Sequence, residues 1–385
     1  MTPRPLQRTA PGMPLDRLAA GLIDREMPGD LWIDDLTLDS RQVGRGSLYL
    51  ACRGARHHGL EFARAAIEAG ALAILFEPDG ADRALPQARS AAQVSGILLE
   101  PVPRLKERAG ALADRFFGFP SRILAVAGVT GTSGKTTTAF LIAQALTALG
   151  RPAGYIGTLG CGLPGSGSGA SGSAGALQPF GLTTADAVTA HRQLAHLQAL
   201  GAECVGMEVS SHALAQDRVS GIRFRAAAFT NLTRDHLDFH GSMEAYAAAK
   251  ARLFERDLDA RVINVDDEFG RDLARRFAGA PGRLVLTSRR GALSAQWRAL
   301  PLTTRVCAHE LQQGPEGSSF LLEVTPGARA SAQAGARAGT RAAAPRVPVR
   351  LSLLGDFNID NALTAAGVLL ALDAAPEQIA AALGE

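Results

Sequence analysis

The chain has 385 residues, of which 46% are hydrophobic and 20% are charged, and its formal net charge is +3. These values are typical of a globular protein of two or three domains, and the scattered basic residues give no reason to expect nucleic acid as a partner. No apolar run is long enough to cross a membrane and no secretory signal is present, which favours the cytoplasm. Cys52, Cys161, Cys204 and Cys307 are far apart without metal-type spacing, so we expect free thiols.

The first part of the chain predicts a disordered tail over 1–14 and a small α/β domain over 15–120. Helical spacing of apolar residues is found at Leu15–Ile23 and Val102–Phe117. Short apolar runs predict strands at Ser47–Ala51, Ala71–Phe76 and Gly96–Leu99. Phe119-Pro120-Ser121 marks the boundary of this domain.

A phosphate-binding loop is the clearest signal in the sequence. The apolar run Ile123–Ala127 predicts a buried strand, and glycines 128, 131 and 134 follow it before Lys135 and Thr136. Apolar residues at helical spacing then continue to Leu149. In such a loop the backbone N–H groups surround phosphate, the lysine reaches the β- and γ-phosphates, and the threonine binds Mg²⁺. The first glycine is one position earlier than in a strict P-loop.

The segment 121–385 predicts a second domain built on a doubly wound, mostly parallel sheet, because strands and helices alternate along it. Expected strands are Ala153–Gly157, Glu203–Val209, Arg225–Thr230, Val262–Val265, Leu284–Leu286, Phe320–Val324 and Val347–Leu354. Expected helices are Ala185–Leu200, one capped by Ser242, and Pro376–Leu383. Low-complexity sequence at 162–176 and 326–346 predicts two flexible insertions.

Polar side chains follow several of these strands. Since ligands bind at the carboxyl ends of parallel strands, we expect functional groups there. The residues at such ends are Glu208, Asn231, Asp235, His236, Asn264 and Asp266.

A series of motifs resembles the Mur ligase family: GVTGTSGKTTT, LTTAD, MEVSSHALAQDRV, TNLTRDHLDFHG, AYAAAKARLF, NVDD and LLGDFNIDNALTA, with TLDSR and SLYLACRG in the N-terminal domain. The resemblance implies an ATP-dependent ligase of peptidoglycan precursor synthesis, which adds the third amino acid to UDP-MurNAc-L-Ala-D-Glu through an acyl phosphate. The family has three domains, for the UDP-sugar, ATP and the amino acid. The motifs match only the first two, so we expect the C-terminal ligase domain to be absent from this chain. Meso-diaminopimelate is favoured over L-lysine as the amino acid, and a monomer is expected.

The resemblance also implies the catalytic and metal-binding residues. Thr136 and Glu208 match ligands of a first Mg²⁺, and His236 matches a ligand of a second. Lys250 matches a lysine that reacts with CO₂ to form a carbamate, which requires a neutral amine in a partly buried site. Lys135, Glu208, His236 and carbamylated Lys250 are therefore the expected catalytic set. From composition alone, Lys250 would be a surface lysine and His236 a structural histidine.

Further matches concern the nucleotide and the UDP-sugar dipeptide. The residues expected at ATP are Gly128, Thr130, Gly131, Thr132, Ser133, Gly134, Lys135, Thr136, Thr137, Asn358 and Asn361. The residues expected at the other substrate are Leu38, Ser40, Thr183, Thr184, Ser210, Gln216 and Arg218. Thr184 has an alternative as the N-cap of a helix at Ala185, and the two asparagines have one as a loop and helix cap. Ala55-Arg56-His57 departs from the family pattern, which leaves the uridine-diphosphate contacts of that loop open.

Two other functions stay open at this point. A folylpolyglutamate synthase-like ligase would share the P-loop variant, but it would lack the N-terminal domain that carries TLDSR. A truncated protein that binds nucleotide and UDP-sugar without turnover would fit the length, whereas the intact catalytic motifs favour an enzyme.

Overall fold

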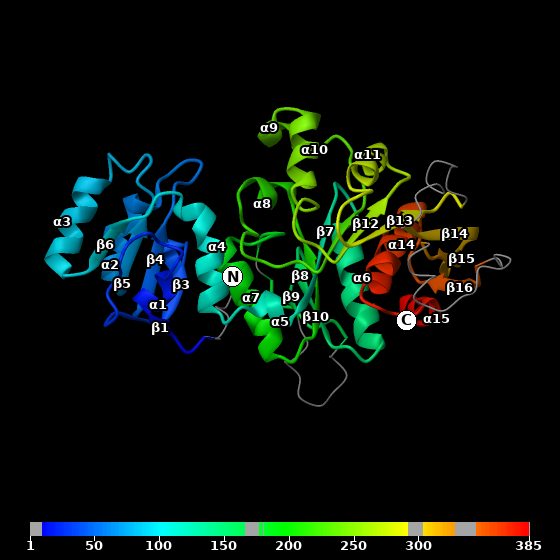
Figure 1. Ribbon diagram of the computed structural model, residues 1–385, viewed down its shortest axis with the longest axis horizontal. Helices are drawn as coiled ribbons and strands as arrows, with labels where there is room; N and C mark the ends of the chain where they lie inside the picture. Colours follow the sequence, from blue (N-terminus) through cyan, green and yellow to red (C-terminus); the bar gives the residue numbers. More distant parts are fainter. Residues whose placement is uncertain (1–9, 166–176, 180, 292–302, 328–343, 385) are drawn as a thin grey trace. The chain divides into compact units, whose positions relative to one another are not determined.

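The computed structural model describes residues 10–165, 177–179, 181–291, 303–327 and 344–384, which form two compact units (Figure 1). The first unit comprises Met1–Ile123, Ala185–Ala199 and Gln216–Ile222, and the second comprises Leu124–Thr184, Leu200–Ala215 and Arg223–Glu385. Residues 166–176 and 328–343, the greater part of the two predicted insertions, lie outside the described residues.

The first unit is built on a four-stranded parallel sheet in the order β3–β4–β5–β6. Its strands are β3 (Asp35–Thr37), β4 (Ser47–Ala51), β5 (Ala71–Phe76) and β6 (Leu98–Pro101), and a small sheet pairs β1 (Met13–Pro14) with β2 (Trp32–Ile33). Its helices are α1 (Leu15–Ala19), α2 (Ala63–Glu68), α3 (Leu85–Ser95), α4 (Leu105–Phe116), α5 (Pro120–Ile123) and α7 (Ala187–Ala199), with 3₁₀ turns η1 (Ser40–Gln42) and η2 (Gly59–Phe62).

Both faces of this sheet are covered, which explains why its strands are continuous apolar runs in the sequence. Along β4, Leu48 and Leu50 belong to a core with residues of α1, α4 and α7, whereas Tyr49 and Ala51 belong to a second core with residues of α2 and α3. The period of two along the strand therefore fills both cores from one segment.

The predicted tail and the predicted first helix of this unit are wrong in detail, and one helix was missed. The predicted tail over 1–14 is too long, because Met13–Pro14 pairs with β2. The first helix ends at Ala19 rather than Ile23, and Gly21 follows with a φ of +67°. Helix α3 was not predicted, because Ala88 and Ala92 are its buried residues and give only a weak apolar pattern.

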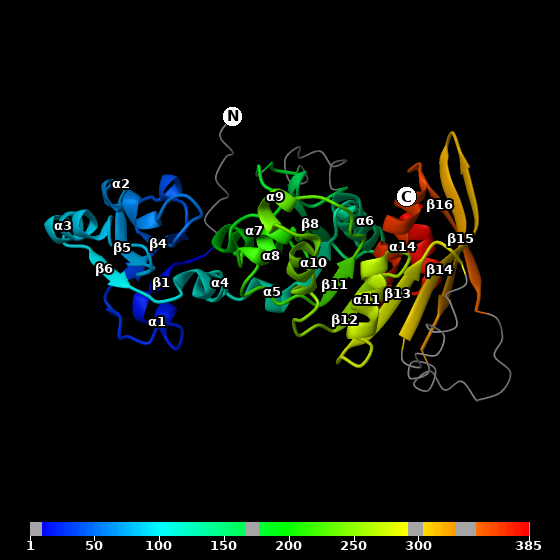
Figure 2. The ribbon, with the colours of Figure 1, turned by 90° about the horizontal axis from the view of Figure 1, so that it is seen from above.

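The second unit contains a ten-stranded sheet in the order β16–β15–β14–β13–β12–β11–β7–β10–β8–β9. Its strands are β7 (Ala125–Thr130), β8 (Ala153–Gly157), β9 (Gly160–Gly162), β10 (Cys204–Glu208), β11 (Ala226–Phe229), β12 (Ala260–Asn264), β13 (Arg283–Ser288), β14 (Thr303–Gly314), β15 (Gly317–Thr325) and β16 (Arg346–Leu351). In this spatial order, all neighbouring strands between β14 and β8 pair in parallel. The pairs at the edges are antiparallel: β8 pairs with β9 at one edge, and β14, β15 and β16 form a ribbon at the other (Figure 2). The predicted doubly wound, mostly parallel fold is confirmed.

The helices of this unit are α6 (Lys135–Ala148), α8 (Ser211–Ala215), α9 (Leu237–His240), α10 (Met243–Ala251), α11 (Glu268–Arg276), α14 (Asp356–Ala371) and α15 (Pro376–Leu383). Buried residues of α6, α14 and α15 share one hydrophobic core with the sheet. From β7 the chain continues to one side through β8 and β10, and then returns to the other side at β11. The loop after β7 therefore lies at the topological switch point, where parallel sheets bind ligands.

Candidate active site

The Gly-rich loop joins the carboxyl end of β7 to Lys135, the first residue of α6. Gly134 precedes the helix with a φ of +82°, and a Cβ there would lie 2.1 Å from Asn361 Oδ1, so the position requires glycine. The loop begins later than predicted, because Gly128 and Thr130 are part of β7. A Cβ at Gly128 would lie 2.8 Å from the Phe224 ring, so this glycine serves packing in the strand.

Lys135 is folded onto the loop. Its Nζ donates hydrogen bonds to the carbonyl oxygens of Gly131 (3.0 Å) and Thr132 (2.8 Å). Burial lowers the pKa of Lys135, while the charges of Glu208 and Asp235 oppose that shift. A phosphate would offer this cation anionic acceptors in place of neutral carbonyls, and such hydrogen bonds are stronger.

Asn231, one of the predicted strand-end residues, fixes the loop to the end of β11. Its Oδ1 accepts a hydrogen bond from Ser133 N (2.9 Å), and its Nδ2 donates to Ser133 O (3.1 Å). Its own carbonyl accepts from Thr132 N (2.9 Å), and Thr230 Oγ1 donates to Ser133 O (2.7 Å). The backbone conformation of the loop is thus set by polar groups from a neighbouring strand.

Glu208 ends β10 and is completely buried. Thr136 Oγ1 donates to its Oε2 (2.9 Å), and Tyr155 OH donates to its Oε1 (2.5 Å). Thr158 N also donates to Oε1 (2.8 Å). Thr136 and Glu208, which were predicted to bind the same Mg²⁺, thus lie within hydrogen-bond distance of each other. Tyr155 and Thr158 were missed, because their contacts with Glu208 arise only when β8 lies beside β10.

Lys250 is 1% exposed, although composition alone would place a helical lysine on the surface. Its Nζ donates to Gly131 O (2.7 Å), the same carbonyl that Lys135 contacts, and lies 4.4 Å from the centre of the Tyr246 ring. Burial, and then the Lys135 charge, lower the pKa of Lys250 to about 6. The amine is therefore mostly neutral at pH 7, and the neutral form is the one that reacts with CO₂.

His236 lies before α9 with a φ of +52°, and its side chain is 46% exposed. Its ring packs against those of His212 and Tyr246, with centroid distances of 4.8 and 6.1 Å. Its Nε2 is 3.5 Å from Asp235 Oδ2. The structure therefore brings His236 beside Tyr246, which also packs against Lys250.

The predicted substrate residues of the second unit cluster at the end of β10. Thr184 Oγ1 donates to the Glu208 carbonyl (3.0 Å) and accepts from Ser210 N (3.1 Å). The alternative in which Thr184 caps a helix is wrong, since α7 begins at Ala187 and Asp186 accepts from its first N–H groups. Thr183 Oγ1 accepts from Thr158 Oγ1 (3.1 Å).

The remaining predicted substrate residues belong to the first unit. Arg218 donates to Gln216 Oε1 through Nε (3.0 Å) and a terminal nitrogen (2.6 Å), and burial lowers its pKa. Ser40 begins η1, and Leu38 is partly buried beside the core of this unit. In the loop at 55–57, His57 Nδ1 is 3.0 Å from Glu61 Oε2.

Asn358 and Asn361 are buried in the first turns of α14. Asn358 Nδ2 donates to Leu354 O (2.8 Å), and Asn361 Nδ2 donates to Asn358 Oδ1 (3.2 Å). Asn361 Oδ1 lies directly against Gly134 of the phosphate loop. More than 200 residues separate these groups in the chain, but the packing of α14 on α6 brings them together.

In the described part of the chain, no three His, Cys, Asp or Glu side chains converge to hold a metal ion. The donors that do converge are the Thr136 hydroxyl and the Glu208 carboxylate, which are hard oxygen ligands of the kind Mg²⁺ takes when phosphate and water supply the others. This arrangement fits a metal that is completed by a nucleotide.

Comparison with known sequences bears on the same residues. The Mur ligase middle domain profile matches residues 129–369, and the profile described as Mur ligase family, catalytic domain, matches residues 33–117. The chain belongs to the Mur ligase family. The resemblance seen in the sequence motifs is thereby confirmed.

Individual relatives extend the comparison. A protein of Xanthomonas campestris, named UDP-N-acetylmuramoyl-L-alanyl-D-glutamate--2,6-diaminopimelate ligase, is 44% identical over 365 residues, which are 94% of this chain and 64% of that protein. A Pseudomonas putida protein of the same name is 41% identical over 95% of this chain and 65% of its own length. The chain thus spans about two thirds of the length of these relatives.

Solved structures share the fold. A structure of a ligase of that name has a TM-score of 0.72 and 25% identity, and the match covers 97% of this chain and 66% of the other. A MurF ligase of Thermotoga maritima in complex with ADP has a TM-score of 0.52 and 16% identity over 91% of this chain and 65% of its own.

In the described segments, no helix combines the length and apolar character needed to cross a membrane.

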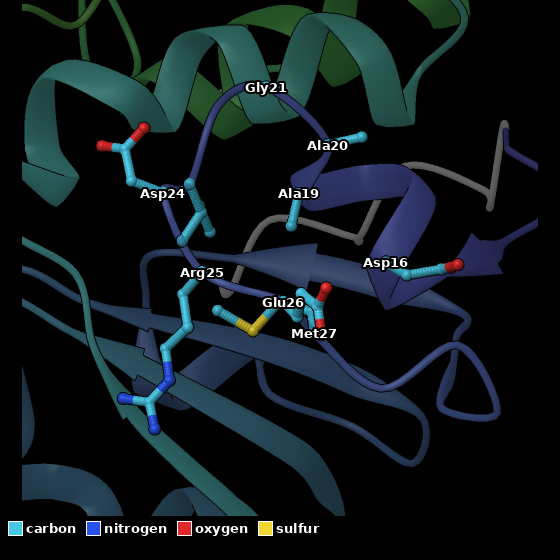
Figure 3. Close-up of a pocket in the computed structure, with 9 residues that line it drawn as sticks. Asp16, Ala19, Ala20, Gly21, Asp24, Arg25, Glu26 and Met27 are labelled. Carbon is cyan, nitrogen blue, oxygen red and sulfur yellow. The ribbon is translucent and has the colours of Figure 1, made fainter.

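A separate pocket of about 590 Å³ lies in the first unit, between α1 and the segment that follows it (Figure 3). Asp16, Asp24, Arg25 and Glu26 are its charged residues. Arg25 pairs with Glu100 at 2.7 Å, and none of the predicted site residues lines the pocket. The charged residues of the pocket are mostly acidic and lie at the protein surface. They give no reason to place the reaction in this pocket.

Proposed function

We propose that this chain is the UDP-sugar-binding and ATP-binding part of an ATP-dependent ligase that adds meso-diaminopimelate to UDP-MurNAc-L-Ala-D-Glu. The observation that carries the proposal is the placement of a neutral, buried Lys250 beside Lys135 on the Gly131 carbonyl, next to Thr136 and Glu208. The names of the relatives support the substrates and the product. The domains proposed are 15–120 for the UDP-sugar and 121–385 for ATP, except that Ala185–Ala199 and Gln216–Ile222 belong to the compact unit of the UDP-sugar domain.

The chemistry divides among the residues as follows. Lys135 and the N–H groups at the start of α6 neutralise and hold the phosphates of ATP. Thr136 and Glu208 would hold a first Mg²⁺, and His236 with carbamylated Lys250 would hold a second. When bound, these ions would neutralise charge on the γ-phosphoryl group during its transfer to the substrate carboxylate. The acyl phosphate formed has an activated carbonyl, which the incoming amine attacks as phosphate leaves.

Lys250 must lose its proton before it can act. A neutral amine adds to CO₂ and releases a proton, which gives an anionic carbamate with two oxygens in a site where Lys135 already supplies positive charge. Burial disfavours the charged form of the amine, so most of it has lost the proton at pH 7.

We propose further that the protein acts as a cytoplasmic monomer and needs no nucleic acid.

Hydroxylamine trapping tests the reaction without any requirement for the third amino acid. The chain is incubated with Mg-ATP, UDP-MurNAc-L-Ala-D-Glu and hydroxylamine, which attacks an acyl phosphate to give a hydroxamate. We expect ADP and hydroxamate in equal amounts. ADP without hydroxamate would indicate a simple ATPase, and binding of both substrates without ADP would support the alternative of a binding protein without turnover.

Lys250→Ala is the informative variant in this assay. It should abolish hydroxamate formation while Mg-ATP still binds, and a short added carboxylic acid should restore part of the activity by replacing the carbamate oxygens. Lys106→Ala, on α4 of the first unit, is the matched control and should behave as wild type. Full activity of Lys250→Ala would exclude the carbamate.

A further inference from the structure

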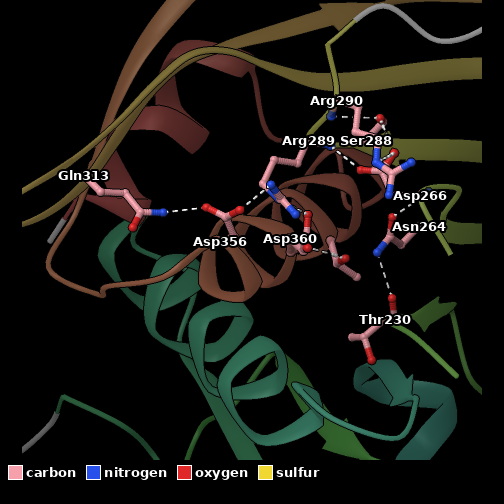
Figure 4. A network of polar contacts seen from close by, with 10 residues as sticks. Thr230, Asn264, Asp266, Ser288, Arg289, Arg290, Gln313, Asp356 and Asp360 are labelled. Carbon is pink, nitrogen blue, oxygen red and sulfur yellow. Dashed lines mark hydrogen bonds and ion pairs between the residues drawn. The ribbon is translucent and has the colours of Figure 1, made fainter. Parts of the chain in front are cut away.

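A network of side chains connects the phosphate loop with the first turn of α14 through the carboxyl ends of three strands (Figure 4). It begins at Thr230, whose hydroxyl holds Ser133 O of the loop and whose carbonyl accepts from Asn264 Nδ2 (2.8 Å). Asn264 Oδ1 accepts from Asp266 N (3.0 Å). The network thus starts at the end of β11 and passes to the end of β12.

Asp266 carries the network to β13. Its Oδ1 accepts from Ser288 Oγ (2.7 Å), and its Oδ2 accepts from Arg289 N (2.8 Å). Both carboxylate oxygens are used, and the side chain is only 13% exposed. The backbone of Arg289 is therefore held in place before its side chain makes any contact.

The Arg289 side chain then crosses to α14. Its Nε donates to Asp360 Oδ1 (3.1 Å), and a terminal nitrogen donates to Asp356 Oδ2 (2.7 Å). The other Asp356 oxygen accepts from Gln313 Nε2 of β14 (2.6 Å). Charge-assisted bonds to two carboxylates one helical turn apart hold the start of α14 against the sheet.

This turn of α14 carries Asn358 and Asn361, and Asn361 lies against Gly134. In the sequence, Asn358 lies between Asp356 and Asp360, the two aspartates that Arg289 contacts. The polar connections therefore run from Ser133 through Thr230, Asp266 and Arg289 to α14, and the close packing of Asn361 on Gly134 leads back to the phosphate loop. Together these contacts restrict the position of the two asparagines relative to the phosphate-binding groups.

We propose that Arg289 is a positioning residue of the nucleotide site, which holds the start of α14 so that Asn358 and Asn361 meet the nucleoside while the phosphates occupy the loop. The proposal rests on the nucleotide site proposed above. It places Arg289 outside direct contact with the phosphates, so its loss should weaken the recognition of adenosine and leave phosphate binding intact.

Calorimetric titration with two ligands tests this separation. Mg-ATP probes the whole site, and inorganic tripolyphosphate with Mg²⁺ probes the phosphate loop alone. Arg289→Ala should raise the Kd for ATP about tenfold and change the Kd for tripolyphosphate less than twofold. Arg289→Lys keeps the charge but cannot reach both carboxylates in the same geometry, so it should restore part of the affinity.

Three further variants complete the test. Asp356→Asn weakens the ion pair with Arg289 from the side of α14, at a half-exposed residue. It should reproduce the loss of affinity for ATP, and it serves as the test if Arg289→Ala does not fold. Arg64→Ala removes an exposed ion pair with Glu68 on α2 and should change neither Kd. Lys135→Ala should raise the Kd for both ATP and tripolyphosphate.

The outcomes separate the two proposals. If Arg289→Ala and Asp356→Asn leave the Kd for ATP within twofold of wild type, or raise both Kd values equally, Arg289 has no positioning role. If wild type binds neither ligand, or Lys135→Ala changes neither Kd, the nucleotide site itself is wrong.

Discussion

Replacing Lys250 with methionine should stabilise the second unit, because burial lowers the pKa of this amine below 7. The side chain is 1% exposed, and its pKa falls from 10.5 to about 6. Each pKa unit corresponds to about 1.4 kcal/mol, so keeping this amine neutral at pH 7 costs about 5 kcal/mol relative to the unfolded chain. Methionine has a similar length and carries no charge to remove.

The substitution also has a cost. It removes the hydrogen bond from Lys250 to Gly131 O, which contributes about 1 kcal/mol. Gly131 O keeps a donor, since Lys135 Nζ contacts it at 3.0 Å, so no buried acceptor is left unpaired. The net expectation is a gain of about 4 kcal/mol at pH 7, which corresponds to a rise of about 8 °C or more in Tm for a unit of this size.

The effect should depend on pH in a defined direction. Between about pH 6 and 10.5 the unfolded chain binds a proton at Lys250 that the folded chain does not, so the stability of wild type rises with pH over this range. Lys250→Met lacks this dependence. The difference in Tm should therefore be largest near pH 6 and shrink toward pH 10.

Differential scanning calorimetry in CO₂-free buffer measures both quantities, because CO₂ would convert the amine to a carbamate and change the comparison. Lys106→Met, at a partly exposed lysine of α4, is the matched control and should shift the free energy of unfolding by less than about 0.5 kcal/mol. A lower Tm for Lys250→Met at pH 7, or a difference that does not vary with pH, would show that Lys250 is not held neutral.

Other substitutions test the contacts around the phosphate loop. Lys135→Ala should weaken Mg-ATP binding by about 1.5–3 kcal/mol through the loss of a charge-assisted contact, and equal calorimetric affinity in both forms would contradict this. Tyr155→Phe removes a 2.5 Å hydrogen bond to buried Glu208 and should lower the free energy of unfolding in urea by about 1–3 kcal/mol; an unchanged urea midpoint would mean that water replaces the hydroxyl. Gly134→Ala should destabilise the chain by about 1–3 kcal/mol, because the position has a φ of +82° and Asn361 occupies the space, and a Tm equal to that of wild type would refute the clash.

Local sequence was sufficient for the phosphate loop and for most of the sheet. The run Ile123–Ala127, the glycines and Lys135 are neighbours in the chain, so their spacing alone predicts a strand, a loop and a helix. The buried strands β4, β5, β8 and β10 were predicted for the same reason, since a parallel strand covered on both faces is a continuous apolar run. Ser242 was predicted as an N-cap, and its side chain accepts from Ala245 N.

Local sequence was misleading where a residue's partner lies far along the chain. Thr184 is a residue type that often caps a helix, and it precedes a predicted helix. Its hydroxyl instead bridges Glu208 and Ser210, because β10 ends beside it. Tyr155 gives no functional signal within its strand, and its contact with Glu208 exists because β8 pairs with β10. In both cases strand pairing, which periodicity does not encode, decides the contact.

The state of Lys250 and the setting of Asn361 were decided only by the tertiary structure. An alanine-rich helix predicts an exposed lysine, but the packing of α10 buries the amine beside Tyr246 and the phosphate loop, and desolvation there removes its proton. Asn361 meets Gly134 because α14 packs on α6 and Arg289 holds its first turn. The sequence alone determined which chemical groups are present and which element carries each of them. Their distances and protonation states follow from packing between segments that are remote in the chain, because burial and charge proximity depend on three-dimensional neighbours.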